Sequence, residues 1–301
     1  MSTLESERLH WGSHGPDWPN HSFSRFVEAG GVRWHVQIAG DGPDLLLLHG
    51  AGGSTHGWAD LLPRLARSYR VVAPDLPGHA FSSALPPERT GPAELTTAVT
   101  RFLDAVATKP TGIVAHSAGA AVAILLGTSG AVRPERCVFL APSLARPPRT
   151  GPPFVQELIA PLLRADSAAG LAAVFGRSFV TNALLKSTGS RVPARSAALY
   201  RTLAGNPAHI GAVLRLLVQW DPEGIEARLG DFEPSTLVLA GERDGWIPLK
   251  QIEGVTASLP DARLRVLDGL GHLAHEEAPE HVLELLLPWL DGAGANGETD
   301  G

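Results

Sequence analysis

The segment Gly112-Ile113-Val114-Ala115-His116-Ser117-Ala118-Gly119 carries the strongest structural signal in the sequence. Its first half is a short apolar run typical of a buried strand, and a helix-forming run, residues 120–126, follows it. Ala115, Ala118 and Gly119, small residues on both sides of Ser117, permit the sharp strand-to-helix turn that lifts a serine hydroxyl above a sheet. Residues 115–119 match the motif G-x-S-x-G except at Ala115, so the segment predicts a nucleophilic serine at position 117.

Strand and helix signals alternate outward from this segment. Residues 45–48 and 237–240 look buried on both faces, as strands of a parallel sheet between helices must be. The first two strands alternate polar and apolar residues, as edge strands do, and residues 29–31 between them predict a hairpin. The predicted strands are residues 23–28, 32–39, 44–48, 69–73, 111–115, 136–140, 236–240 and 263–267, and the predicted helices are residues 55–68, 92–107, 118–128, 249–259 and 279–290.

The alternation breaks between residues 141 and 231, where a proline-rich start leads into alanine- and leucine-rich runs without a strand signal. We therefore predict an α/β fold: an eight-stranded, mostly parallel sheet with helices on both faces and a helical cap inserted after the sixth strand. Residues 22–140 and 232–290 would form the core, and residues 1–21 an N-terminal extension. Residues 291–301 have no apolar anchor and are expected to be disordered.

Composition excludes several classes of protein. The net charge is −6 and no stripe of Lys and Arg appears, which argues against a nucleic-acid partner. The single cysteine, Cys137, lies in an apolar run, so no disulfide framework exists and a reducing compartment fits. Residues 1–21 lack the apolar core of a signal peptide, and the longest uncharged apolar stretch, residues 118–126, is too short to span a bilayer. We expect a cytoplasmic protein, and peripheral membrane contact stays open.

Two later loops carry the partners that a nucleophilic serine needs. A serine hydroxyl requires a histidine to accept its proton, and the histidine requires a carboxylate to orient it. Asp244 follows the strand at 236–240, and His272 follows the strand at 263–267, so both are predicted to meet Ser117 at one edge of the sheet. Glu242 and His275 are the alternatives, but Glu242 lies closer to its strand and His275 begins a helical run, which favours a structural role for each.

The loop His49-Gly50-Ala51-Gly52-Gly53 follows the strand at 44–48 and predicts an oxyanion hole. Ala118, directly after the serine, would supply one backbone N–H donor, and Ala51 the second, with Gly52 as the alternative donor or a substrate contact. The loop lacks the residues of a phosphate-binding motif. Residues 272–276 match no metal-binding motif either, so neither a metal nor a cofactor is expected.

Together these motifs resemble the α/β-hydrolase superfamily over nearly the whole chain. They are His49-Gly50-x-Gly, residues 75–79, the Ser117 elbow, residues 241–244 and Gly271-His272. Longer stretches resemble a narrower family, the magnesium-chelatase-associated hydrolases encoded with bacteriochlorophyll biosynthesis: residues 17–20, 24–27, 29–37, 72–79, 116–121 and 269–277. This resemblance implies an accessory role beside magnesium insertion into protoporphyrin IX, with magnesium chelatase subunits as partners. Ala115 and Ala80 replace common glycines by one methyl each, so we expect slightly tighter turns and the triad geometry retained.

Four aromatic residues, each of which is alternatively a core residue, are candidates for the substrate site: Trp58, His116, Trp220 and Trp246. They suit a flat apolar ligand, so the expected substrate is a small-molecule ester or a tetrapyrrole-related compound. The leading hypothesis is a serine hydrolase, and the alternative is a catalytically silent porphyrin-binding or chelatase-docking module. Thioester, carbon–carbon bond and cofactor-free peroxide chemistry stay open, whereas dehalogenases and epoxide hydrolases need an aspartate at position 117.

Overall fold

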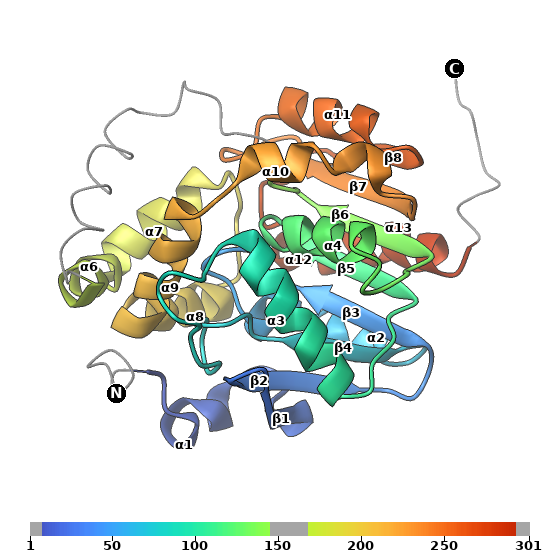
Figure 1. Ribbon diagram of the computed structural model, residues 1–301. Coiled ribbons are helices and arrows are strands. Elements are labelled where there is room, and N and C mark those ends of the chain that lie inside the picture. The colour runs from blue at the N-terminus through green and yellow to red at the C-terminus, as the bar shows by residue number, and fades with distance from the viewer. Residues whose placement is uncertain (1–7, 145–167, 293–301) are drawn as a thin grey trace.

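A single eight-stranded sheet forms the centre of the computed structural model, which describes residues 8–144 and 168–292 (Figure 1). The strand order is β1-β2-β4-β3-β5-β6-β7-β8; the strands from β4 through β8 run parallel, and β1 and β2 are antiparallel to their neighbours. The strands are β1 Ser24–Ala29, β2 Val32–Ala39, β3 Asp44–Leu48, β4 Arg70–Pro74, β5 Gly112–His116, β6 Arg136–Leu140, β7 Ser235–Gly241 and β8 Ala262–Leu267. The predicted eight-stranded, mostly parallel sheet is confirmed.

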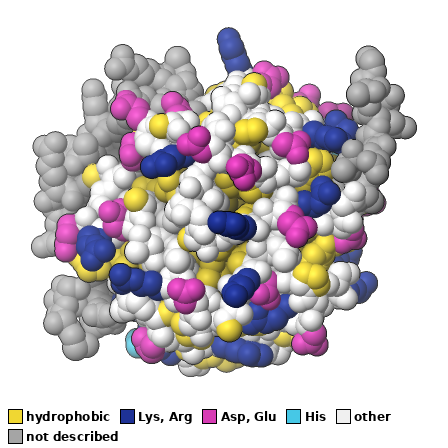
Figure 2. All heavy atoms as spheres, turned by 45° about the vertical axis from the view of Figure 1, so that its right-hand side comes forward, with side chains coloured by type: hydrophobic (Ala, Val, Ile, Leu, Met, Phe, Trp, Pro, Cys, Tyr) yellow, Lys and Arg dark blue, Asp and Glu magenta, His cyan; other side chains and the backbone are white. Residues whose placement is uncertain are grey.

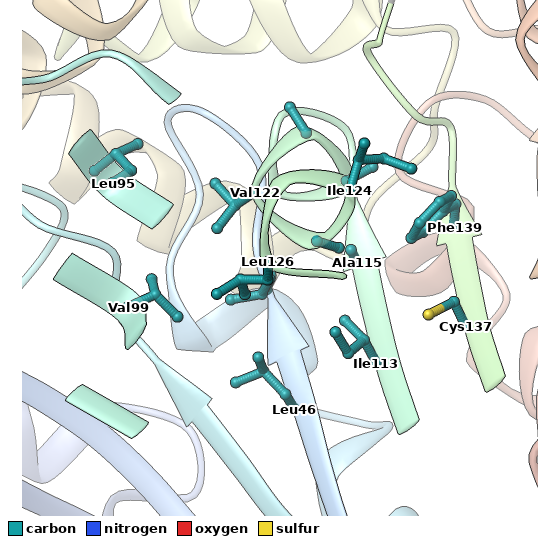
Figure 3. Packing of buried hydrophobic residues seen from close by; sticks show 14 of the residues in the cluster. Leu46, Leu95, Val99, Ile113, Ala115, Val122, Ile124, Leu126, Cys137 and Phe139 are labelled. Carbon is teal, nitrogen blue, oxygen red and sulfur yellow. The ribbon is translucent and has the colours of Figure 1, made fainter. Parts of the chain in front are cut away.

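Helices cover both faces of the sheet, because successive residues of each central strand point to opposite sides. Leu46 and Leu48 of β3 belong to a core cluster with α3 (Pro92–Ala105), α4 (Gly119–Thr128) and α11 (Leu249–Ser258). Leu45 and Leu47 belong to a second cluster with α2 (Leu62–Leu65) and α13 (Pro279–Leu290). Figure 3 shows the first cluster, in which the apolar side chains of α4 lie over the sheet.

The prediction of a single helix over residues 55–68 is wrong. The chain forms the 3₁₀ helix η4 (Thr55–Trp58) and then the short α2. Pro63 lies in the first turn of α2, where its missing N–H is tolerated. Inside a continuous helix, its ring would clash with the carbonyl of residue 59. The proline therefore ends one helical turn and begins another.

The prediction that the first two strands are edge strands holds only for β1. Strand β2 lies between β1 and β4, and its polar residues His35 and Gln37 are fully buried. Residues of the N-terminal extension cover them: the ring of Trp11, in α1 (Trp11–His14), lies 4.9 Å from the His35 ring, and Gln37 Nε2 donates to the carbonyl of Pro19 at 2.7 Å. The polar positions of the alternation thus face a covering segment rather than solvent. The covering segment also contains the short 3₁₀ helices η2 (Gly15–Asp17) and η3 (His21–Phe23). Residues 1–7 of the predicted extension lie outside the described residues.

Within the insertion after β6, residues 141–144 and 168–231 are described. Its helices α6 (Ala168–Phe175), α7 (Ser178–Ser187), α8 (Ala194–Ala204) and α9 (Pro207–Val218) gather on one side of the sheet (Figure 1). The following α10 (Pro222–Glu226) and η5 (Leu229–Asp231) contribute Ile225 and Leu229 to the core cluster of α4. Residues 145–167 of the predicted cap and 293–301 of the predicted tail lie outside the described residues.

The described surface carries charges of both signs. On the face in Figure 2, Lys and Arg side chains alternate with Asp and Glu, and its described residues form no stripe of one sign. Within residues 8–144 and 168–292, we find no helix with the length and apolar character needed to cross a membrane.

Candidate active site

Ser117 occupies a strained turn between β5 and α4. Its φ is 49°, in the left-handed region that favours glycine, and its N–H donates to the carbonyl of Leu140 at 2.9 Å. Gly119 begins α4 against the end of β3, where a Cβ would lie 2.4 Å from the carbonyl oxygen of Leu48. The small residue at 119 therefore lets the helix approach the sheet, and Ser117 takes up the resulting bend. Ala118 is the N-cap residue of α4, at the end where helix N–H groups lack partners within the helix.

The loop after β3 passes directly against the serine. A Cβ on Gly50 would lie 2.9 Å from Ser117 Cβ, so only glycine permits this approach. His49 holds the loop: the N–H of Leu76 donates to His49 Nε2 at 2.8 Å, so Nδ1 carries the proton and donates to the carbonyl of Gly50 at 2.8 Å. Burial lowers the pKa of His49 to about 3. His49 is thus a neutral brace for the predicted oxyanion loop.

Asp244 and His272 form a buried hydrogen-bonded pair. Asp244 Oδ2 accepts from His272 Nδ1 at 2.8 Å, and Asp244 Oδ1 accepts from the N–H groups of Trp246 and Ile247 at 2.8 and 2.9 Å. Because Nδ1 carries the proton, His272 Nε2 presents a lone pair, and that atom is buried without a hydrogen-bond partner among the described residues. The other candidate carboxylate, Glu242, instead accepts from the N–H of Gly269 at 2.8 Å.

His116 and His275, which also line the site, have structural contacts. His116 Nε2 donates to the carbonyl of His272 at 3.1 Å and so fixes the backbone of the loop that carries the imidazole. The ring of His275 packs 4.6 Å from the His116 ring and 5.1 Å from Trp58, and burial lowers the pKa of His275 to about 3. Within the described residues, no group of three or more His, Cys, Asp or Glu side chains could hold a metal ion.

A segment of the cap, Thr188-Gly189-Ser190, joins the acid loop to the histidine loop; we call it the strap. The carbonyl of Thr188 accepts from the N–H of Gly245 at 3.2 Å and of His272 at 3.0 Å. Ser190 Oγ accepts from the N–H of Leu273 at 2.8 Å. The strap directly follows α7 of the cap. Its hydrogen bonds therefore link the cap to the two loops that carry Asp244 and His272.

A cavity of about 270 Å³ lies between these loops and the cap. Its core side includes Ala51, Gly52, Trp58 and His116, all predicted as oxyanion or substrate contacts. Trp246 lines it as well, with its ring 5.2 Å from the His272 ring. Apolar side chains of α7 and α9, among them Leu185, Val213 and Leu214, line the cap side.

Four predicted residues lie outside the lining of this cavity: Ser117, Ala118, Asp244 and Trp220. Ser117 and Ala118 are not among its lining residues, although Gly50, which lines it, abuts Ser117. The structure does not support the predicted substrate contact of Trp220. This side chain packs against the core cluster of α4, because the chain has already returned to the sheet where α10 begins.

Sequence reasoning missed the cap residues that contact the site. Thr188 and Ser190 flank Gly189 in a short Thr-Gly-Ser segment that matches no known motif. Tyr200 of α8 also belongs to no sequence motif. The one signal that could have indicated a bend is the glycine at 189, a residue common in turns, and in the structure its φ is 77°. Which loops the bend contacts depends on how the cap packs.

Glu276 is a buried carboxyl group between the core and the cap. It lies in α12 (Ala274–Glu277), and its Oε1 accepts from the hydroxyl of Tyr200 at 2.6 Å. Oε2 is buried without a hydrogen-bond partner among the described residues. Burial raises the pKa of Glu276 to about 7, so this carboxyl group keeps its proton to a higher pH than an ordinary glutamate does.

We expect the Glu276→Gln variant to become more stable relative to wild type as the pH rises. The pKa of Glu276 is about 7 in the folded protein against an ordinary 4.5, so the folded state retains a proton that the unfolded chain releases. This stabilising contribution is complete below pH 4.5 and is lost as the pH rises through 7, an effect on the order of 3 kcal/mol. Glutamine keeps an acceptor for Tyr200 and does not ionise. Urea unfolding of both proteins at about pH 5 and about pH 8 measures the difference, and a pH-independent difference would contradict the assignment.

The architecture and its three loops define a class of protein. An eight-stranded, mostly parallel sheet with a serine after β5, an aspartate after β7 and a histidine after β8 has the fold and the residue order of the α/β hydrolases.

Comparison with known proteins agrees with this class. Residues 45–285 match the model of the alpha/beta hydrolase family, and the chain belongs to that family. The magnesium-chelatase 30 kDa subunit of Rhodobacter capsulatus is 32% identical over 288 residues, covering 92% of this chain and 97% of that protein. A 2-hydroxy-6-oxo-6-phenylhexa-2,4-dienoate hydrolase of Burkholderia cepacia is 30% identical, with coverages of 88% and 92%. An alpha/beta hydrolase fold protein from Burkholderia ambifaria superimposes with a TM-score of 0.74 at 25% identity, covering 88% of this chain and 97% of that one.

Proposed function

We propose that this chain is a serine hydrolase that cleaves small-molecule esters through an acyl-enzyme on Ser117. The observation that carries the proposal is the state of His272. Its Nδ1 proton is held by Asp244 at 2.8 Å, and its Nε2 is buried with no partner among the described residues. A histidine oriented in this way is what a general base requires.

Each group has a role in the proposed reaction. His272 Nε2 takes the proton of the Ser117 hydroxyl while Oγ attacks the ester carbonyl, and Asp244 stabilises the imidazolium that forms. The N–H groups of Ala118 and Ala51 donate to the tetrahedral oxyanion. His272 then protonates the leaving alkoxide, and water, activated by the same nitrogen, releases the acid and restores Ser117.

Covalent labelling tests this function directly. We expect a fluorophosphonate probe to label the native protein once, with the adduct located on the peptide that contains Ser117 by mass spectrometry. A short-chain p-nitrophenyl ester should release a burst of p-nitrophenolate when deacylation is slower than acylation. Heat-denatured protein is the control, because the activated serine depends on the folded site. Labelling at a different residue, or none in the native protein, would refute the proposal.

The similarity to the magnesium-chelatase 30 kDa subunit supports a place for this hydrolase beside magnesium insertion in bacteriochlorophyll biosynthesis. The same observation favours a second candidate, a module that binds porphyrin or docks on chelatase subunits without turnover. Purified chelatase subunits assayed with wild type and with Ser117→Ala distinguish the two. Equal stimulation of magnesium insertion by both proteins would favour the docking module, and stimulation by wild type alone would favour the hydrolase.

A further inference from the structure

The cavity beside the site has no formally charged side chain in its described lining. Its described lining residues include no Asp, Glu, Lys or Arg. Their polar side chains are those of histidines, Ser54, Trp58, Thr181, Thr188, Tyr200 and Trp246. A ligand that carries a charge into this space would therefore lose its hydration without gaining an opposite charge.

Four of the five lining histidines do not supply a positive charge either. Burial lowers the pKa of His49 and of His275 to about 3, and it lowers those of His116 and His209 well below their ordinary value. Their nitrogens also serve the backbone: the N–H of Ala80, for example, donates to His209 Nδ1 at 3.1 Å. At neutral pH these four imidazoles are uncharged.

Carboxyl groups that accept hydrogen bonds from lining residues also disfavour an anion. The Glu276 carboxyl group lies behind Tyr200, which lines the cavity and donates its hydroxyl to that carboxyl group. Arg215 is on the same helix as the lining residues Val213 and Leu214, but it is not itself a lining residue. An anionic group in the cavity would therefore face no cation from Lys or Arg among the described lining residues, and carboxyl groups lie behind the lining residues Tyr200 and His272.

The size of the cavity and the residues at its rim further restrict the class of ligand that it can hold. A cavity of about 270 Å³ is smaller than the pockets of about 300–1,000 Å³ that enclose drug-sized ligands. Leu184, Leu217 and Trp246 line the cavity and are also between 43% and 49% exposed, so the rim is apolar. These dimensions suit a short chain or a single ring rather than a four-ring macrocycle.

We propose that the cavity takes the acyl group of the ester as an uncharged, apolar chain or single ring and rejects acyl groups that carry a carboxylate. This assignment rests on the proposed function, since it names the substrate class of the same site.

Three p-nitrophenyl esters with matched acyl chains test it: the hexanoate, the adipate monoester with a free terminal carboxylate, and the methyl ester of that adipate. The methyl ester is larger than the free acid but uncharged, so it separates charge from size. We expect the two uncharged esters to have similar kcat/KM values, and the free acid a value at least about 100-fold lower. Spontaneous hydrolysis of each ester is subtracted. Comparable turnover of the free acid would overturn the substrate assignment while leaving the hydrolase intact.

Measuring ligand binding to the Ser117→Ala variant tests the cavity assignment independently of the hydrolase proposal. Saturation-transfer NMR should detect methyl hexanoate but not monomethyl adipate. If wild type hydrolysed none of the esters and this selective binding persisted, the hydrolase proposal would fail and the cavity assignment would stand. Equal binding of both compounds would overturn the cavity assignment.

Two arginine variants test whether the cavity itself sets the preference for uncharged acyl groups. Leu217 lines it and is 49% exposed, whereas Phe179 of α7 is 67% exposed and is not a lining residue. Leu217→Arg should raise kcat/KM for the free acid relative to the hexanoate by at least about tenfold. Phe179→Arg adds the same charge on the cap and should leave that ratio unchanged. An equal rise in both variants would mean that long-range attraction sets the preference, which contradicts the assignment.

Discussion

Replacing Ser117 with alanine should lower kcat for a short-chain p-nitrophenyl ester by about 10⁴- to 10⁶-fold and abolish fluorophosphonate labelling. The change removes the only atom of the proposed triad that bonds to the substrate. Alanine at φ 49° bears the same backbone strain as serine, so the free energy of unfolding should change little. The loss therefore separates chemistry from folding.

A glycine variant sharpens this test. Glycine adopts positive φ without steric cost, so Ser117→Gly should be as inactive as Ser117→Ala but more stable, by about 1 kcal/mol. Steady-state kinetics and thermal unfolding of both variants measure the two effects. Ser143→Ala is the control, because the contact of residue 143 to Ser117 uses its backbone N–H, at 3.1 Å. More than about one-hundredth of wild-type kcat in both Ser117 variants would exclude Ser117 as the nucleophile.

Gly189→Ala is expected to have the second largest effect, although Gly189 is not a lining residue of the cavity. A Cβ at this position would lie 1.7 Å from the carbonyl oxygen of Arg243, so the strap must move away from the acid loop. The same strap holds the backbone of His272 through Thr188, at 3.0 Å. Because displacements of about 1 Å cost on the order of 100-fold in rate, kcat should fall at least about 100-fold while KM changes much less.

Gly130→Ala is the matched control for backbone strain. Gly130 has φ 73°, close to the 77° of Gly189, and a Cβ there would meet nothing within 4 Å. It should cost about 1–2 kcal/mol of stability and leave kcat unchanged.

A spectroscopic measurement distinguishes a displaced pair from simple destabilisation. The proton between His272 Nδ1 and Asp244 should give a low-field NMR resonance in wild type and Gly130→Ala, and that resonance should broaden or disappear in Gly189→Ala. Should Gly189→Ala fail to fold, Ser190→Ala removes only the acceptor for the N–H of Leu273, at 2.8 Å, and should lower kcat about tenfold. Normal kcat together with a normal resonance would show that the strap does not position the pair.

Much of the fold was predictable because its signals are local. Each apolar run flanked by turn residues became a strand of the sheet, since burial of such a run requires no knowledge of its partner. Asp244 and His272 could be predicted in the same way, because a loop after a parallel strand always lies at the carboxyl edge. The prediction of one helix over residues 55–68 was wrong because it followed the apolar pattern of the segment, whereas Pro63 separates two short helices.

The sequence by itself determined the strands, the Ser117 turn and the order of the three loops, because these depend on backbone preferences of neighbouring residues. Only the tertiary structure decided the burial of β2, the contact of the strap with His272, and the placement of Glu276 against Tyr200, 76 positions away in the chain. It also decided that His49, His116, His209 and His275 are neutral, because the desolvation that lowers their pKa values depends on everything packed around each side chain. Such contacts have no local signal, since their energy appears only when segments far apart in the sequence pack together.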